Sequence, residues 1–163
     1  MKLSTKGRYA VMALADIGVY GHEGPVPLAE IAERQGISLS YLEQLFAKLR
    51  RAGLVKSVRG PGGGYELRYE LAEIRIADII GAVDEPLTAT RCTPGRNASC
   101  VARSSRCLTH DLWDELGNQI RLYLSSVTLA DVCEGRVLGT SGVIGQNDSI
   151  RDQDGNLPLV ALN

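Results

Sequence analysis

Two short runs of helically spaced apolar residues meet at Gly36, and this junction constrains the fold more than any other feature. Residues 27–35 form the first run, and the second begins at Ser38 or Ser40. Pro27 suits a first helical turn, and a glycine suits the left-handed position that ends a helix. The pattern therefore predicts two helices joined by a tight turn, a helix-turn-helix. The inward-facing positions of its second helix are Leu42, Leu45, Phe46 and Leu49.

The segments that flank this motif predict one more helix on each side and a hairpin. Apolar residues recur at helical spacing over Thr5–Tyr20, where glycines stop the pattern, and again over residues 76–83, which we expect to pack back on the first helix. Two short runs, residues 54–58 and 65–67, flank Arg-Gly-Pro-Gly-Gly-Gly, which is typical of a β-hairpin. No Lys-Ser/Thr pair follows these glycines, which excludes a phosphate-binding loop. The predicted fold class is mainly α, a winged helix-turn-helix domain with a small β-hairpin wing.

The outward residues of the second helix of the motif carry groups that bind DNA. The N-terminal turn of this helix enters the major groove in such motifs. Gln44 can bond an adenine edge and Glu43 can accept from a cytosine amine, while Ser40 and Lys48 suit phosphates or base edges. Ser40 and Glu43 also fit a capping box, in which the glutamate only satisfies a backbone donor, so both roles of Glu43 stay open. The predicted DNA-contacting residues of this helix are Ser38, Ser40, Tyr41, Glu43, Gln44, Lys48 and Arg50.

The glycine-rich tip of the predicted wing adds two candidate DNA contacts, Arg59 and Gly60. Glycine lets the backbone approach DNA closely, and the negative potential of a minor groove favours arginine. The formal net charge of -1 hides about +3 over residues 1–70, +1 over residues 71–110 and -5 over residues 111–163. The positive field that attracts phosphates therefore lies in the N-terminal part of the chain.

Apolar residues recur at four-residue steps after residue 107, which predicts a long amphipathic helix. The N-terminal domain is already closed by its own core, so we expect this face to pack on the same helix of a second chain. Folding back on its own domain is the alternative. A short helix over residues 128–134 follows, with Cys133 as a core residue, and residues 137–163 are expected to form a flexible tail. The predicted dimer-interface residues are Leu108, Leu112, Leu116, Ile120, Tyr123 and Leu124.

Three of the four cysteines and one of the two histidines lie within residues 91–110, among glycines, serines and a proline. Cys107 and His110, three residues apart at the start of the long helix, project from one side. Structural zinc accepts three cysteines and a histidine, but its usual sites contain close cysteine pairs, whereas an iron-sulfur cluster accepts irregular spacing. Spacing leaves these two occupants open, and a redox disulfide would need no histidine. The predicted metal ligands are Cys92, Cys100, Cys107 and His110.

Four stretches of the sequence resemble the IscR family of iron-sulfur cluster regulators. They are KGRYAV from Lys6, GISLSYLEQLFAKLR from Gly36, VRGPGGGY from Val58, and the four predicted ligands followed by Leu112-Trp113. The likeness covers about residues 1–135. It implies a homodimeric winged-helix regulator of cluster-assembly genes, whose cluster-loaded and empty forms bind different promoters. It also implies a 2Fe-2S cluster on the three cysteines and the histidine, and His110 favours this family over the related nitric-oxide sensor NsrR.

The expected organisation is a DNA-binding domain over residues 1–85, a cluster-binding loop over 86–110, a dimerisation helix with a short following helix over 111–136, and the tail. No nucleophile-base pair or cofactor fingerprint predicts an enzyme. No signal peptide or membrane-spanning run is recognised, which predicts a cytoplasmic protein that uses no membrane. The expected partners are double-stranded DNA at pseudo-palindromic promoter sites, a second copy of the chain and the machinery that donates clusters. The alternatives are a nitric-oxide- or iron-responsive repressor of the same family and a zinc-bearing DNA-binding protein.

Overall fold

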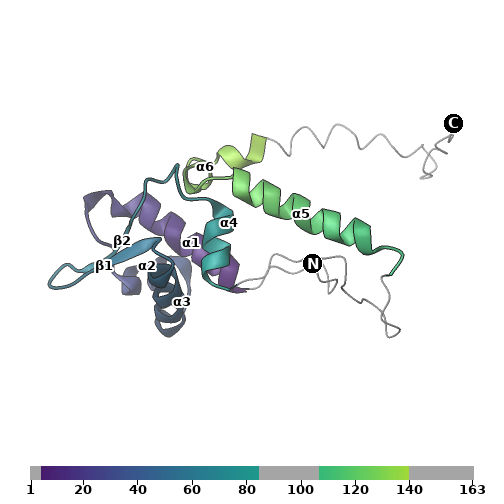
Figure 1. The fold of residues 1–163 in the computed structure, drawn as a ribbon. Coiled ribbons are helices and arrows are strands. Elements are labelled where there is room, and N and C mark those ends of the chain that lie inside the picture. Colours follow the sequence, from purple (N-terminus) through teal and green to yellow (C-terminus); the bar gives the residue numbers. More distant parts are fainter. Residues whose placement is uncertain (1–4, 85–106, 140–163) are drawn as a thin grey trace, which may run out of the picture.

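A computed structural model describes residues 5–84 and 107–139 of the chain. Its elements are α1 (Thr5–Tyr20), the 3₁₀ turn η1 (Gly21–Glu23), α2 (Leu28–Gln35), α3 (Leu39–Arg51), β1 (Val55–Val58), β2 (Gly64–Leu67), α4 (Ile76–Ala82), α5 (His110–Ser126), α6 (Leu129–Cys133) and the 3₁₀ turn η2 (Arg136–Gly139). Figure 1 shows the hairpin projecting from one side of a helical unit and α5 running out on the other. This arrangement confirms the predicted winged helix-turn-helix class.

The core of the helical unit lies between α1, α3 and α4. The inward stripe of α3 that the sequence predicted is buried throughout, and Leu42, Phe46 and Leu49 are fully excluded from solvent. Burying a side chain of this size stabilises the fold by roughly 1.5–3 kcal/mol. Helix α4 packs on α1, as predicted. The stripe therefore fixes which face of α3 points outward.

The turn between α2 and α3 follows the predicted glycine geometry. Gly36 has φ 64° and ψ 35°, a left-handed conformation that a residue with a side chain adopts at a cost of about 1–2 kcal/mol. The amide of Ile37 then donates to the Ala32 carbonyl at 3.1 Å, and the Ile37 side chain is buried. A buried residue inside the turn sets the angle at which α3 leaves α2.

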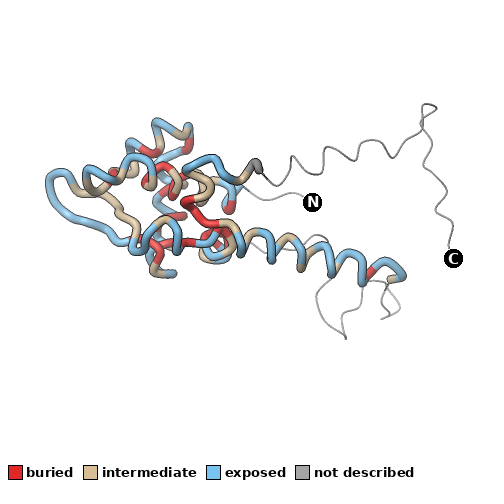
Figure 2. Tube along the Cα trace, turned by 90° about the horizontal axis from the view of Figure 1, so that it is seen from above, coloured by how far each residue is buried: buried red, intermediate tan, exposed pale blue. Residues whose placement is uncertain are grey.

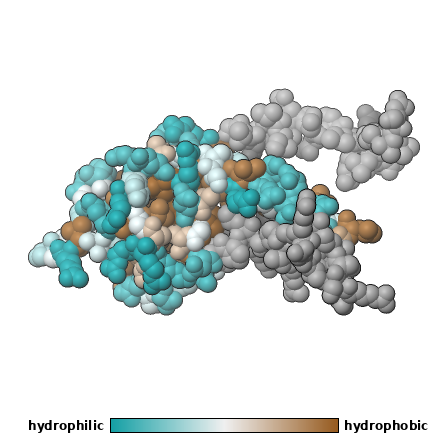
Figure 3. Space-filling model, in the orientation of Figure 1, coloured by the Kyte–Doolittle hydropathy of each residue, from teal (hydrophilic) through white to brown (hydrophobic). Residues whose placement is uncertain are grey.

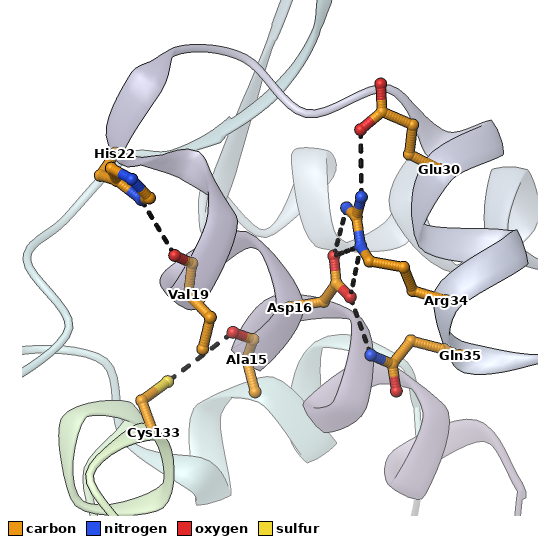
Figure 4. Close-up of polar contacts among 8 residues, drawn as sticks. All are labelled: Ala15, Asp16, Val19, His22, Glu30, Arg34, Gln35 and Cys133. Carbon is orange, nitrogen blue, oxygen red and sulfur yellow. Dashed lines mark hydrogen bonds and ion pairs between the residues drawn. The ribbon is translucent and has the colours of Figure 1, made fainter.

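A buried carboxylate ties α1 to α2 just before this turn (Figure 4). Asp16 lies on the otherwise apolar inner face of α1, and its side chain is fully buried. Arg34 donates to both of its oxygens, at 2.8 Å from Nη2 and 3.1 Å from Nε, and Gln35 donates from Nε2 at 2.8 Å. The Arg34 guanidinium also bonds Glu30 at 3.1 Å and lies over the Tyr20 ring. Asp16 first, and then Glu30, raise the pKa of Arg34 above its usual value through their hydrogen bonds and charges.

The wing is anchored at its base rather than only at its turn. Strands β1 and β2 pair antiparallel, with Val55 opposite Leu67 and Val58 opposite Gly64. On the side of β2 away from β1, Tyr65 exchanges two backbone hydrogen bonds with Val26, at 2.8 and 3.0 Å. The Tyr65 ring also meets Phe46 of α3 edge to face, with centroids 4.7 Å apart. The hairpin is therefore held to the chain before α2 and to α3 together.

Among the described residues, helix α5 contacts the DNA-binding unit at its C-terminal end. The segment after β2 pairs with the start of α6: Leu129 donates to the Ile74 carbonyl at 2.8 Å, and Ile76 donates to the Val127 carbonyl at 3.0 Å. Thr128 and Asp131 form a capping box at the start of α6. Beyond this attachment α5 runs away from the unit, and Figure 2 shows it pale blue, hence exposed, along most of its length.

Candidate DNA-binding surface and metal centre

The outer face of α3 presents most of the predicted DNA-contacting residues to solvent. This face lies opposite the buried stripe, so it cannot serve the core. Tyr41 and Lys48 are half-buried at its border. Tyr41 meets Tyr9 of α1 edge to face, with ring centroids 5.9 Å apart, which holds it beside the N-terminus of α3. The predicted DNA contacts of this segment that are exposed are Ser38, Ser40, Glu43, Gln44 and Arg50.

Of the two roles that the sequence left open for Glu43, the capping box with Ser40 is not formed. The N-cap of α3 is Ser38, which has φ -63° and ψ 138°, and no side chain caps the helix there. Ser40 lies inside the first turn, where its backbone is already helical. Glu43 therefore has no capping role, and its exposed position one turn further on leaves it available to a base edge.

Lys48, predicted to meet DNA, has an internal ion partner. Its Nζ lies 2.9 Å from Oδ2 of Asp84, the residue at which the first described segment ends. The hydrogen bond and charge of Lys48, with smaller contributions from Lys6 and Arg51, lower the pKa of Asp84 below its usual value. Among the described residues Asp84 is the one non-glycine with positive φ, at 56°. A phosphate would have to compete with this carboxylate for Lys48.

The tip of the wing exposes Arg59 and Gly60, the two predicted DNA contacts of the hairpin. Gly60 has φ 104°, a conformation that side chains rarely adopt, and its carbonyl accepts a hydrogen bond from the Gly63 amide at 2.9 Å. The tight turn therefore depends on glycine and keeps Arg59 at the outer end of β1.

Two of the four predicted metal ligands, Cys107 and His110, come together at the start of α5. The His110 amide donates to the Cys107 carbonyl at 3.0 Å, so the two residues share one turn. His110 is only 1% exposed, although the helix it opens is mostly in solvent, and Cys107 is half-buried. Cys92 and Cys100 lie outside the described residues. In the described ranges alone, no three His, Cys, Asp or Glu side chains form a metal site.

The fourth cysteine belongs to the packing of α6. The Cys133 thiol lies 3.7 Å from the Ala15 carbonyl and packs against the core, in agreement with the role predicted for it. Burial raises the pKa of this thiol, and the charge of Glu134 raises it further. A raised pKa disfavours the thiolate, which is the form that binds metals.

The apolar face of α5 is exposed near the free end and half-buried near the attached end. Leu112 is 61% and Leu116 40% exposed, whereas Leu124 packs against the domain core. A four-residue step turns about 40° further round a helix of 3.6 residues per turn, so the predicted repeat spirals from solvent onto the domain. A straighter row follows alternate steps of three and four residues. We call this row the seam; it consists of Trp113, Leu116, Ile120, Tyr123 and Val127.

Leu108 does not belong to this helix, contrary to the expectation. Helix α5 begins at His110, and Leu108 lies fully exposed in the turn before it. Hydrophobic side chains stand out in brown at the free end of α5 in Figure 3.

No helix within the described ranges is long and apolar enough to cross a membrane.

Several residues of this surface were not predicted from the sequence. Asp84 is 36 positions from Lys48, so no local pattern links them. Asp16 did leave a signal, because it interrupts the apolar run of α1, and a charge in such a run indicates a buried partner. Leu39, the first residue of α3, is 43% exposed beside the predicted contacts, although its spacing continues the inward stripe.

Comparison with known proteins adds the family. Residues 3–135 match the Rrf2 family, described as an iron-dependent transcriptional regulator. The HTH-type transcriptional regulator IscR of Vibrio atlanticus (strain LGP32) is 56% identical over 81% of this chain and 75% of that protein. The regulator of the same name from Serratia proteamaculans (strain 568) is 48% identical over the whole chain and 97% of that protein.

Solved structures agree with the sequence relatives. T. potens IscR superposes with a TM-score of 0.66 at 41% identity, covering 83% of this chain and 88% of that chain. CymR (YrzC), the global cysteine regulator of B. subtilis, gives 0.68 at 36% identity, covering 82% and 97%. The two sequence relatives are named as transcriptional regulators, which agrees with the prediction of a DNA-binding regulator and with the prediction that the chain is not an enzyme. The chain belongs to the Rrf2 family, as a DNA-binding transcriptional regulator of the IscR type.

Proposed function

We propose that this regulator senses iron-sulfur clusters by binding a 2Fe-2S cluster on Cys92, Cys100, Cys107 and His110. The observation that supports it most is the pairing of Cys107 with a buried His110 in the first turn of α5. Thiolate and imidazole are donors that iron-sulfur centres accept together. Burial protects the histidine from competing water, and the half-buried cysteine stays accessible to a cluster delivered by the assembly machinery.

The regulator acts as a homodimer that reads a pseudo-palindromic promoter site. The seam supports this, because its residues Trp113, Leu116 and Tyr123 are exposed, and an apolar row at alternate three- and four-residue steps is the pattern of helices that pair along their length. Pairing places two copies of α3 and two wings on one duplex, each reading one half-site. In each copy we assign base or phosphate contact to Ser38, Ser40, Tyr41, Glu43, Gln44, Lys48, Arg50, Arg59 and Gly60.

Cluster occupancy sets which promoters the dimer binds. The genes that it controls are those for cluster assembly, and the protein acts in the cytoplasm. The DNA-binding unit has its own core, so the empty protein remains folded and keeps a binding surface. Cys107 and His110 stand at one end of α5, and the other end is hydrogen-bonded to the segment that follows the wing. This connected path gives occupancy a physical route to the DNA-reading elements.

Anaerobic purification with metal and sulfide analysis tests the cluster. We expect a coloured protein with two irons and two sulfides per chain, which Cys92→Ala, Cys107→Ala and His110→Ala each diminish. Cys133→Ala is the matched control and should keep its cluster. A colourless protein that carries zinc would overturn the assignment. Equal iron content in all variants would do so as well.

Gel shifts with loaded and empty protein test the regulatory step. Promoter fragments upstream of cluster-assembly genes should bind the two forms with different affinities, and Cys92→Ala should behave as the empty form under both conditions. If nitric oxide, and not cluster supply, changes the binding, the protein is a nitric-oxide sensor of the same family.

A further inference from the structure

Leu39 occupies the outer tip of the recognition helix, where a leucine adds little to folding. It is the first residue of α3, directly after the N-cap Ser38. The buried stripe of α3 begins one turn later at Leu42, and Leu39 is 43% exposed and outside the hydrophobic core formed by the described residues. Its helical spacing would place it with the stripe, but the helix tip extends past the edge of the core.

Most other exposed large apolar residues have a different explanation. Those on α5 and in the turn before it lie outside α3, and Trp113, Leu116 and Tyr123 among them belong to the seam. Val19 and Tyr20 end α1 and Tyr69 follows the wing, so none of these three lies on α3. Among the described residues Leu39 is therefore the exposed large apolar side chain of the recognition helix. The exposed large apolar residues outside α5 and its approach are Val19, Tyr20, Leu39, Val58 and Tyr69.

The neighbours of Leu39 on the helix surface are candidate base-reading groups. Glu43 lies four residues further on, hence next to Leu39 on the same side of α3, and Ser40 follows it directly. Helical side chains lean toward the N-terminus, which is the end that enters the major groove. Leu39 therefore reaches the groove with Ser40 and Glu43, but it can offer only apolar contact.

We propose that Leu39 reads thymine, by packing against the 5-methyl group of a thymine next to the base pair that Glu43 contacts. In the major groove the thymine methyl is the one apolar group among the donors and acceptors that base edges present. Contact with the methyl group removes apolar surface of Leu39 from water, which strengthens binding, and removing one methyl from such a contact weakens binding about fourfold. The inference rests on the proposed DNA-binding function and adds a specificity-determining residue to it.

Replacing thymine by deoxyuridine tests this contact, because it removes the methyl group and leaves base pairing unchanged. Sites are first selected from a random duplex pool with the full-length protein, and each thymine of a selected site is then replaced in turn. Wild type should lose about fourfold at one thymine in each half-site. Leu39→Ala should bind the thymine duplex about as weakly as wild type binds the deoxyuridine duplex, with no further loss at that position.

Two variants serve as controls for the test. Gln44→Ala should weaken binding through other base pairs but keep the fourfold difference between the thymine and deoxyuridine duplexes. Leu39→Met, which again offers an apolar side chain, should show the difference that Leu39→Ala has lost. A methyl effect that persists in Leu39→Ala would overturn the proposal, as would a uniform loss on both duplexes, which indicates contact with the sugar-phosphate backbone. Failure to select any site would instead remove the DNA-binding function itself. Thermal unfolding of Leu39→Ala should match wild type, because the residue lies outside the core.

Discussion

Asp16 and Arg34 form an ion pair whose two members are unequally buried, and this inequality predicts unequal mutational effects. The Asp16 side chain is fully buried and that of Arg34 is 27% exposed. Arg34→Ala leaves a buried carboxylate with Gln35 as its one remaining side-chain donor among the described residues, so we expect a loss of about 3–5 kcal/mol in the free energy of unfolding. Asp16→Asn leaves an arginine that still reaches Glu30 and water, so its loss should be smaller, about 1–3 kcal/mol.

Urea denaturation of the two variants measures the difference, and Glu30→Gln is the control. Glu30 is more than half exposed, so its loss should change the free energy of unfolding by under about 1 kcal/mol. Equal effects of Arg34→Ala and Glu30→Gln would show that the buried carboxylate does not depend on the arginine.

The contact between Asp84 and Lys48 predicts a gain of DNA affinity when the carboxylate is neutralised. Asp84→Asn removes the negative charge and suits the left-handed backbone, since asparagine tolerates positive φ well. Lys48 is then available to a phosphate, and binding should strengthen up to about fivefold at low salt. The slope of log affinity against log salt should steepen by about 0.9, the value for one more phosphate contact. If Asp84→Asn in a Lys48→Met background still strengthens binding, the lysine is not responsible.

At the scale of elements, glycines and apolar spacing predicted the helices well, but packing decided where α3 begins. The predicted Thr5–Tyr20 helix is α1, and Gly36 has the expected left-handed conformation. Ser40 and Glu43 have the spacing of a capping box, yet the N-cap is Ser38 and α3 starts at Leu39, because the buried Ile37 ends the turn earlier. Local spacing left Ser38 and Ser40 both open, because the burial of Ile37 in the core depends on tertiary packing.

The candidate site was predictable only where it follows from local pattern. The outward residues of α3 follow once its inward stripe is recognised, and the wing tip follows from its glycines. The Asp84–Lys48 contact depends on how α4 packs beside α3, which no spacing reveals.

The close packing at the base of the wing predicts that a methyl group added at Gly64 lowers both stability and DNA binding. A Cβ on Gly64 would overlap the Val26 carbonyl and lie 2.7 Å from the Pro27 nitrogen, so Gly64→Ala must separate the paired backbones. We expect a loss of about 1–3 kcal/mol in the free energy of unfolding, together with weaker DNA binding as the wing shifts. Gly62→Ala is the matched control: its Cβ meets open space, and only its φ of 73° is unfavourable. Equal DNA binding by Gly64→Ala and wild type would show that the base does not position the wing.

The capping box of α6 predicts a pH dependence with a definite sign. Hydrogen bonds from the Thr128 hydroxyl and amide lower the pKa of Asp131, and Arg136 lowers it further. A depressed carboxyl pKa stabilises the fold above the ordinary pKa of the unfolded chain, and this contribution disappears as the pH falls through the folded value. Thr128→Ala should cost about 1 kcal/mol at neutral pH, and the gap from wild type should narrow in acid. Ser125→Ala, at an exposed position of α5, should change neither the free energy of unfolding nor its dependence on pH. A difference between Thr128→Ala and wild type that stays constant with pH would contradict the role of Asp131.

For the whole molecule, the arrangement of α5 separates stability from assembly. Its C-terminal end shares hydrogen bonds and core contacts with the DNA-binding unit, while its free end carries exposed apolar side chains and the two described ligands. Substitutions at the attached end should therefore unfold the protein. Substitutions at the free end should change only association and what depends on it.

Leu116→Glu tests this separation, because Leu116 lies on the seam and is 40% exposed in the single chain. A charge there should dissociate a dimer without unfolding the protein, so light scattering after size exclusion should give the mass of one chain while the thermal midpoint barely moves. Binding to a two-half-site duplex should fall by about 10²–10⁴-fold, since the second half-site is no longer held nearby. Leu122→Glu is the matched control: Leu122 is 59% exposed on α5 but points away from the seam, so this variant should remain dimeric. If both variants have the mass of two chains, or if both have the mass of one chain, the seam is not the contact between subunits.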